Sequence, residues 1–346
     1  MSESKIPQFD FINREKERAY LEKYFRNTPN AILFLYGPKS CGKSTLLNRV
    51  VRDLDQEKYA INFLDLRQVM IENFKSFLDI FFQRDLKTKT KDILSGTTFN
   101  IGFFKIDIRD EEIFKKNSFK IIIDQIRKAR EKGIQPVIVI DEIQELKNIY
   151  TNDEKKLLDE LFNLFIALTK VENLAHIVLS TSDSYFIEEM YRSAKLSKTS
   201  EFYFVDHLGR EDIFSWLSND KYNLSQKDIE YIYNYFGGSP WEIRQILVDV
   251  LEGEDLKEIV SDRIKQLSGK VLDFYHRDLE DEGVMQEQFR KISTQIAQKG
   301  FYIISAQDKI SKILRLAIEK DLWFYEASDQ KITANSRSLE HAFGRL

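Results

Sequence analysis

A nine-residue segment near the start of the chain has the spacing of a phosphate-binding loop. It follows the apolar run 31–36 and consists of Gly37, Pro38, Lys39, Ser40, Cys41, Gly42, Lys43, Ser44 and Thr45. The pattern G-x-x-x-x-G-K-S between a strand and a helix directs main-chain N–H groups and the positive end of the helix toward phosphate oxygens. We therefore expect this segment to bind nucleotide phosphates. Lys43 would contact the β- and γ-phosphates, and the Ser44 hydroxyl would bind Mg²⁺.

A pair of carboxylates supplies the other half of such a site. Asp141 and Glu142 follow the apolar run 137–140, which places Asp141 at the carboxyl end of a buried strand, where ligands bind in open α/β sheets. Asp141 would hold Mg²⁺, directly or through water, and Glu142 would act as general base toward the attacking water. A buried strand before a charged helix start gives the same pattern, but the phosphate loop upstream favours the catalytic interpretation.

A short polar segment ends the next apolar run, at 175–180. Its residues are Ser180, Thr181, Ser182 and Asp183. Ser182 or Thr181 could lie between the acidic strand and the phosphate loop and sense the γ-phosphate. A helix N-cap is an equally good interpretation of this segment.

Apolar, β-rich runs separated by helical patterns must position these residues. The runs are 31–36, 60–66, 137–140, 175–180 and 202–205. Such alternation indicates an α/β fold with a parallel sheet sandwiched by helices, here over residues 1–206. Residues 95–109 lack a helical period and predict an inserted β-hairpin, which explains the long separation of Lys43 from Asp141.

The chain becomes helical after residue 206. Three amphipathic patterns, punctuated by Gly237-Gly238 and by Pro240 in the first turn of the third, predict an α-helical lid over 207–265. Helical patterns at 284–299 and 308–320 precede LWFYEA, the turn SDQ, KITA and a closing helix at 336–343. Helices followed by a terminal two-stranded hairpin predict a winged-helix domain over 266–346.

Composition excludes several other classes of protein. The 346 residues are 42% hydrophobic and 31% charged, which is a globular balance, and the single cysteine excludes an internal disulfide. The net charge of −4 gives no chain-wide basic field for nucleic acid. With no signal-peptide pattern and no run near the roughly 18 apolar residues of a membrane span, we expect a cytoplasmic protein without a membrane partner. The histidines lack metal-ligand spacing, so ATP and Mg²⁺ are the expected cofactors.

Five segments spread along the chain form one combination of motifs. They are Phe11-Ile12-Asn13-Arg14-Glu15-x-Glu17 with Leu21, GPKSCGKSTLL at 37–47, DEIQEL at 141–146, the Gly-Gly-x-Pro at 237–240 and the closing LWFYEASDQKITANSRSLEHAF. Together they resemble the archaeal ATPases of the AAA+/STAND branch of P-loop NTPases. The resemblance covers nearly the whole chain and implies a P-loop core, a helical lid, a winged helix and ATP as the nucleotide.

The resemblance also implies roles for residues outside the phosphate loop. The residues that would line the adenine pocket are Phe11, Ile12, Asn13 and Arg14. Gly238 and Pro240 would bring the lid against the nucleotide. Arg244, one turn beyond Pro240, would reach the γ-phosphate as a lid arginine; a solvated helix arginine is the competing interpretation.

The chain departs from the family pattern at two points. Ser182 stands at the sensor position, where many AAA+ proteins have Asn, and no arginine finger is obvious. Arg192 and Arg210 are candidates for a finger by position only. Because a finger contributes roughly 10³–10⁵ in rate, these departures favour slow, switch-like hydrolysis over hydrolysis activated by a neighbouring subunit.

Three functions are compatible with the sequence. The first is an ATP-driven conformational switch that acts on a protein partner or on a second copy. The second is a DNA-handling ATPase like the origin-recognition initiators, which would bind duplex DNA through the winged helix. Residues 270–346 carry twelve Lys+Arg and twelve Asp+Glu, so charge does not support this alternative. The third, a scaffold that binds nucleotide without hydrolysis, is disfavoured by the intact Asp141-Glu142 pair.

Overall fold

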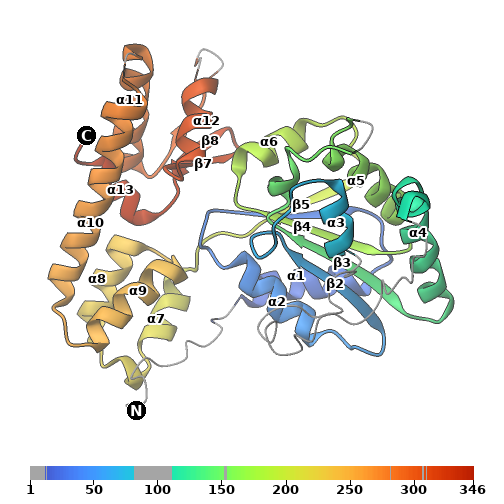
Figure 1. Ribbon diagram of the computed structural model, residues 1–346. Coiled ribbons are helices and arrows are strands. Elements are labelled where there is room, and N and C mark those ends of the chain that lie inside the picture. The colour runs from blue at the N-terminus through green and yellow to red at the C-terminus, as the bar shows by residue number, and fades with distance from the viewer. Residues whose placement is uncertain are drawn as a thin grey trace.

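The computed structural model describes residues 12, 14–81, 111–151, 154–280, 282–305, 308 and 310–346. The hairpin predicted at 95–109 and the predicted site residues Phe11 and Asn13 lie outside these ranges. The described residues form an α/β core, a set of lid helices after residue 206 and a C-terminal unit, residues 283–346 (Figure 1).

The core is built on a parallel sheet with the order β2-β3-β4-β1-β5. Its strands are β1 (Ile32–Tyr36), β2 (Tyr59–Asp65), β3 (Gln135–Asp141), β4 (His176–Thr181) and β5 (Ser200–Phe204). All correspond to the predicted apolar runs. Because successive strand residues face opposite sides, one strand supplies apolar side chains to both layers of helices. The predicted α/β class is confirmed.

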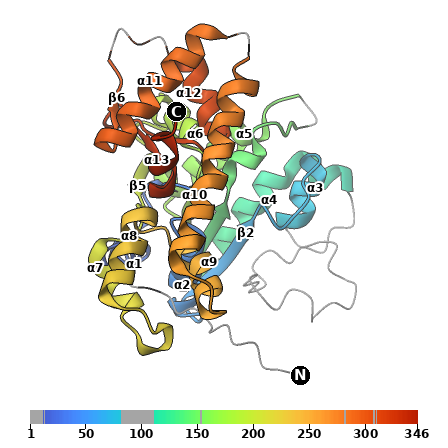
Figure 2. The ribbon, with the colours of Figure 1, turned by 90° about the vertical axis from the view of Figure 1, so that its left-hand side faces the viewer.

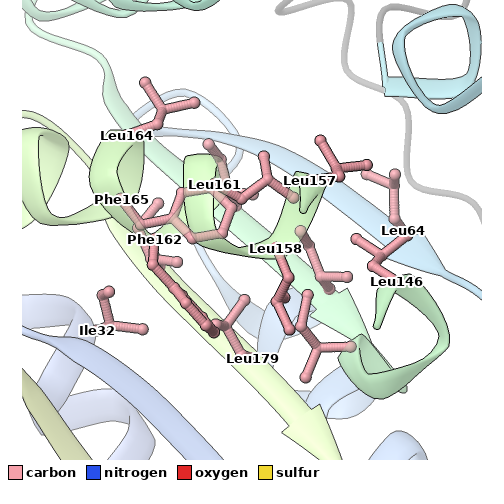
Figure 3. Close-up of a cluster of buried hydrophobic side chains, with 14 of the residues drawn as sticks. Ile32, Leu64, Leu146, Leu157, Leu158, Leu161, Phe162, Leu164, Phe165 and Leu179 are labelled. Atoms are coloured by element: carbon pink, nitrogen blue, oxygen red, sulfur yellow. The ribbon is translucent and has the colours of Figure 1, made fainter. Parts of the chain in front are cut away.

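Helices cover both faces of this sheet. Helices α1 (Glu15–Arg26) and α2 (Lys43–Asp53) pack on the face that includes Leu33 and Val139. The opposite face is covered by α3 (Phe74–Phe81), α4 (Glu111–Glu131), α5 (Leu157–Ile166) and α6 (Ser184–Arg192). Figure 3 shows the contact of α5 with this second face, where Leu161 and Phe162 lie over Ile32 and Leu179. The short turns η1 (Ile143–Leu146) and η2 (Ala167–Val171) follow β3 and α5.

The lid helices have a hydrophobic core of their own. They are α7 (Arg210–Leu217), the turn η3 (Asp220–Tyr222), α8 (Gln226–Phe236) and α9 (Pro240–Leu251). Ser225 caps α8, Gly237 ends it with φ +55°, and Pro240 opens α9. Gly238 contacts the start of the lid so closely that an added Cβ would lie 1.7 Å from the Leu208 carbonyl oxygen.

A long helix, α10 (Leu256–Asp273), connects the lid to the C-terminal unit and continues into the π-turn η4 (Phe274–Asp278) (Figure 2). The predicted boundary between residues 265 and 266 lies inside this helix. Of the described helices, none is both long and apolar enough to span a bilayer.

The C-terminal unit combines helices with a small antiparallel sheet in the order β6-β8-β7. Its elements are α11 (Gly283–Lys299), β6 (Tyr302–Ile303), α12 (Ser311–Glu319), β7 (Trp323–Glu326), β8 (Lys331–Ala334) and α13 (Arg337–Phe343). The hairpin β7–β8 is the predicted one. Strand β6 was not predicted, because two residues are too few to show an alternating pattern. The helices and the terminal hairpin follow one another in the predicted order.

The C-terminal unit packs directly on the core. Phe324 of β7 joins the hydrophobic cluster of the core, with its ring centroid 5.7 Å from that of Phe204. The main-chain N–H of Tyr325 donates to the Ser184 hydroxyl at 3.1 Å, and α12 contacts α6. These contacts hold the C-terminal unit beside the carboxyl edge of the parallel sheet.

Candidate nucleotide-binding site

The phosphate loop connects β1 to α2. An added Cβ on Gly37 would lie 1.9 Å from the Val205 carbonyl oxygen, and Gly42 has φ +100°, so both positions require glycine. Lys43 is buried at the start of α2, and its Nζ donates to the carbonyl oxygens of Gly37 and Pro38 at 3.0 and 2.9 Å. The loop therefore curls around one ammonium group at a helix N-terminus, which is a site for an anion.

Arg14 supports this loop from the N-terminal side. It has a left-handed φ of 82° and a nearly buried side chain. Its guanidinium donates to the Cys41 carbonyl oxygen and pairs with Glu17 at 2.7 Å. The contact with Cys41 was not predicted, because it depends on the left-handed turn before α1.

Asp141 ends β3 in the interior of the protein. Burial raises the pKa of its carboxyl, while hydrogen bonds from the hydroxyls of Ser180 and Ser44 lower that pKa. The strand register sets Asp65 and Ser180 beside Asp141, on β2 and β4. The two predicted metal ligands, Ser44 and Asp141, are thus in contact. Ser180 and Asp65 were missed, although their positions at strand ends could have indicated them.

Arg67 lies among these carboxylates and was not predicted. Its Nη2 donates to Ser44 Oγ at 2.8 Å and to Asp141 Oδ2 at 2.9 Å. Its Nη1 lies 3.4 Å from Glu142 Oε1, and its Nε lies 3.2 Å from Asp65 Oδ1. No spacing in the sequence marks this arginine, because it reaches the site only when β2 pairs beside β3.

Glu142 follows Asp141 with a left-handed φ of 59°. Its carboxylate accepts hydrogen bonds from the Ser182 hydroxyl at 3.2 Å and from the Gln144 amide at 2.6 Å. Thr181 instead donates to Gln144, and Asp183 caps α6. The structure therefore separates the two interpretations of this segment: Ser182 faces Glu142, while Asp183 is the N-cap.

These groups border a cavity of about 740 Å³. Its polar wall includes residues 39–45 of the phosphate loop, with Arg67, Glu142 and Ser182. Ile12, Leu208, Pro240 and Trp241 add apolar surface, and the predicted residue Arg14 also lines the cavity. The cavity can therefore take a ligand with an anionic end and a flat apolar end.

Of the predicted lid arginine, Arg244, and the two finger candidates, Arg192 and Arg210, the described part of the chain places only Arg244 at this cavity. Its side chain is half-buried, and burial lowers the pKa of its guanidinium. Arg192 pairs with Glu188 at 2.7 Å on α6, and Arg210 pairs with Glu230 on the lid. The structure therefore does not bring Arg192 or Arg210 to the cavity.

The C-terminal unit closes one side of the cavity through Ile318, Glu319 and Asp321. Lys39 of the phosphate loop pairs with Asp321, with 2.6 Å between Nζ and Oδ2. The main-chain N–H of Lys39 also donates to Asn335 Oδ1 at 3.2 Å. These contacts between residues about 300 positions apart were not predicted from the sequence.

The donor set fits Mg²⁺ bound together with a nucleotide. Of the described residues, no group of three or more His, Cys, Asp and Glu is arranged to hold a metal ion by itself. Ser44 and Asp141 supply one hydroxyl and one carboxylate that lie next to each other. This is typical of Mg²⁺, which takes one or two protein carboxylates and completes its shell with phosphates and water.

The fold and the site define a nucleotide-binding α/β protein of the P-loop class. Residues 11–246 match the model of a family described as an ATPase domain predominantly from Archaea, and the chain belongs to this family.

Sequence relatives extend over nearly the whole chain. An uncharacterized ATP-binding protein of Methanocaldococcus jannaschii is 36% identical over 324 residues, which cover 91% of this chain and 93% of the relative. An uncharacterized ATP-binding protein of Pyrococcus abyssi is 28% identical over 343 residues, with 94% and 96% covered.

Solved structures share the fold at lower identity. The Walker-type ATPase of Pyrococcus abyssi superposes with a TM-score of 0.66 at 16% identity, covering 97% of each chain. The ORC2 protein of Aeropyrum pernix, in its ADPNP-ADP complexes, gives a TM-score of 0.52 at 11% identity and covers 99% of this chain and 95% of its own. Both matches include the C-terminal unit, so the order of core, lid and C-terminal unit is shared.

Proposed function

We propose that this protein is a slow, Mg²⁺-dependent ATPase in which bound nucleotide sets the position of the C-terminal unit. The observation that carries the proposal is the cavity itself. One space is bordered by the phosphate loop, the acidic end of β3, the lid helix α9 and the C-terminal unit. A ligand there touches all three parts of the chain.

The site residues divide the work of binding and hydrolysis. Lys43 and the loop N–H groups would hold the phosphates, while Ser44 and Asp141 would hold Mg²⁺, which neutralises charge on the phosphates when it is bound. Glu142 would accept a proton from the attacking water, with its carboxylate oriented by Ser182.

The adenine end of the nucleotide would lie against the lid. Ile12, Pro240 and Trp241 offer apolar surface for adenine, and Arg244 lines the same space from α9. The choice of ATP follows the names of the relatives, which are ATP-binding proteins.

The switch rests on charges that the C-terminal unit contributes to the cavity. Glu319 and Asp321 place carboxylates on the same cavity as the phosphate loop. Nucleotide phosphates would compete with Asp321 for Lys39 and would be repelled by both carboxylates. Because a ligand shifts an equilibrium only through such differential contacts, these groups give nucleotide a means to move the C-terminal unit.

A DNA-binding role is less well supported. Helix α12, which precedes the hairpin, contacts α6 of the core on one side and leaves Lys312 and Arg315 exposed on the other. Lys312 pairs with Glu282 at 2.5 Å, and Arg315 pairs with Glu319 at 2.8 Å. Positive charge on this helix is therefore already compensated, whereas DNA binding depends on cations free to contact phosphate.

Steady-state ATP turnover with and without duplex DNA, over a range of salt concentration, tests the proposal. We expect turnover on the order of 10⁻² s⁻¹ or slower, as for a site without an arginine from a partner, and no effect of DNA. Stimulation by DNA that falls steeply with salt would replace this proposal by the DNA-handling one. Absence of both nucleotide binding and turnover would remove the site assignment altogether.

A further inference from the structure

The guanidinium of Arg67 contacts both predicted metal ligands. A single nitrogen, Nη2, lies 2.8 Å from Ser44 Oγ and 2.9 Å from Asp141 Oδ2. A cation that bound both oxygens would have to lie in the same region. Arg67 and a metal ion therefore cannot hold these two oxygens at the same time.

The charges around Arg67 explain why a cation is needed there. Asp141 is fully buried and Glu142 nearly so, while Asp65 lies in register on the next strand. Burying carboxylates without compensation is costly. Of the described residues, Arg67 is the only cation within 4 Å of Asp141 or Glu142, since Lys43 donates to main-chain carbonyls instead.

Arg67 is also placed so that it can leave. It lies in the turn after β2, half of its side chain is exposed, and it lines the cavity. Its contacts with Ser44, Asp141 and Glu142 are polar, so exchange of partners leaves the apolar packing of the core intact.

We propose that Arg67 is an internal competitor of Mg²⁺, which holds the metal position in the nucleotide-free protein and must leave Ser44 and Asp141 before Mg²⁺ binds there. This inference rests on the proposed nucleotide site and adds a residue that controls its metal dependence. The competition does not involve the γ-phosphate, so it applies to ADP as well as to ATP.

The test is the Mg²⁺ dependence of ADP binding, measured by isothermal titration calorimetry at a series of free Mg²⁺ concentrations. Arg67→Gln removes the competing cation, so the half-saturating Mg²⁺ concentration should fall by up to about fivefold, the upper end for exposed ion pairs. Arg127→Gln is the matched control: it removes an arginine of α4 from a partly exposed ion pair with Glu172 and should leave the value unchanged.

A second measurement follows the side chain itself. In protein labelled with ¹⁵N-arginine, the Nε–H resonance of Arg67, assigned by its loss in Arg67→Gln, should shift when Mg²⁺ and ADP are added together. Addition of ADP with a chelator should leave it in place. This measurement uses the wild-type side chain and so does not depend on full stability of the variant.

The outcomes separate this inference from the proposed function. If wild-type protein binds ADP but Arg67→Gln leaves the half-saturating Mg²⁺ concentration unchanged or raises it, Arg67 is not a competitor, and the nucleotide site stands. An Arg67 Nε–H resonance that does not shift when Mg²⁺ is added in the presence of ADP overturns the inference in the same way. If wild-type protein binds no ADP at any Mg²⁺ concentration, both the inference and the proposed site fail.

Discussion

Replacing Asp321 by asparagine should raise the affinity of the protein for ADP and ATP. The Asp321 carboxylate pairs with Lys39 at 2.6 Å and borders the cavity. Phosphates must therefore take Lys39 from Asp321 and come close to a carboxylate. Asparagine keeps the shape of the side chain and tolerates the left-handed φ of 56° at this position, so the substitution removes only the charge.

The exposure of the pair sets the size of the effect. The side chains of Lys39 and Asp321 are 58% and 41% exposed, so water screens their attraction. Such pairs contribute about 0.2–1 kcal/mol. The gain in nucleotide affinity should therefore be at most about fivefold. It should shrink with added salt, because the screening length falls to about 3 Å at 1 M.

Isothermal titration with ADP at low and high salt measures this gain. Asp278→Asn is the matched control, because Asp278 pairs with Lys320 at 2.8 Å, with side chains 37% and 49% exposed, and does not line the cavity. We expect no change in that variant. An Asp321→Asn affinity at or below the wild-type value at low salt would refute the reasoning. An equal gain in nucleotide affinity in Asp278→Asn would show that the effect comes from the change in net charge and not from the Lys39–Asp321 pair.

Four further predictions address the site and the core. Lys43→Ala should lose ADP binding in calorimetry because the loop loses its central cation, and retained affinity would contradict the phosphate-loop assignment. Glu142→Gln should keep ATP binding and lose turnover by about 10²–10⁴-fold in a phosphate-release assay; wild-type turnover would exclude Glu142 as the base. Trp241, 55% exposed at the cavity, should change its fluorescence when ADP binds, and Trp241→Phe should abolish that signal, whereas a signal that persists would place the change elsewhere. Burial lowers the pKa of His176 to about 4, so its unfolded form binds a proton that the folded form does not between about pH 6.5 and 4. The free energy of unfolding should therefore fall as pH falls through that window, by up to about 3 kcal/mol. Chemical denaturation at pH 7 and pH 5 measures this loss, which should be smaller in His176→Leu than in the wild type. An equal loss in the two proteins would contradict the prediction.

The fold was largely predictable because the inner strands β1, β3 and β4 are buried on both faces. A run such as Val137–Ile140 must be apolar throughout to lie between two layers of helices, and such runs stand out in the sequence. The lid was predictable for a different reason, since Gly237 and Pro240 mark a helix end and a helix start. Strand β6 was missed because two residues carry no periodicity, and the hairpin expected at 95–109 lies outside the described residues.

The site was predictable only where its residues are close in sequence. The phosphate loop and the pair Asp141-Glu142 are local patterns with a chemical reason for each position. Arg67 and Asp321 carry no such pattern, because each reaches the cavity through pairing or packing of distant segments. Arg192 and Arg210 were candidates by position for a finger that acts on a neighbouring subunit; within this chain their side chains form ion pairs away from the cavity, and the finger role stays a prediction.

The cations of this site already have partners before any ligand is considered. Lys43 donates to loop carbonyls, Arg67 to Asp141 and Ser44, and Lys39 to Asp321. Binding of Mg²⁺ and nucleotide as proposed would therefore exchange one partner of each cation for another. Each exchange subtracts from affinity the free energy of the contact that is broken.

That subtraction is also what would let the site act as the switch proposed above. Breaking the contact of Lys43 with its own loop changes only the loop, whereas breaking the Lys39–Asp321 pair releases a contact with the C-terminal unit. Coupling between nucleotide and the C-terminal unit cannot exceed the contacts that differ between the two states. Because that pair is partly exposed, we expect a modest coupling that biases the C-terminal unit without locking it, which suits a switch whose output also depends on a partner or a second copy.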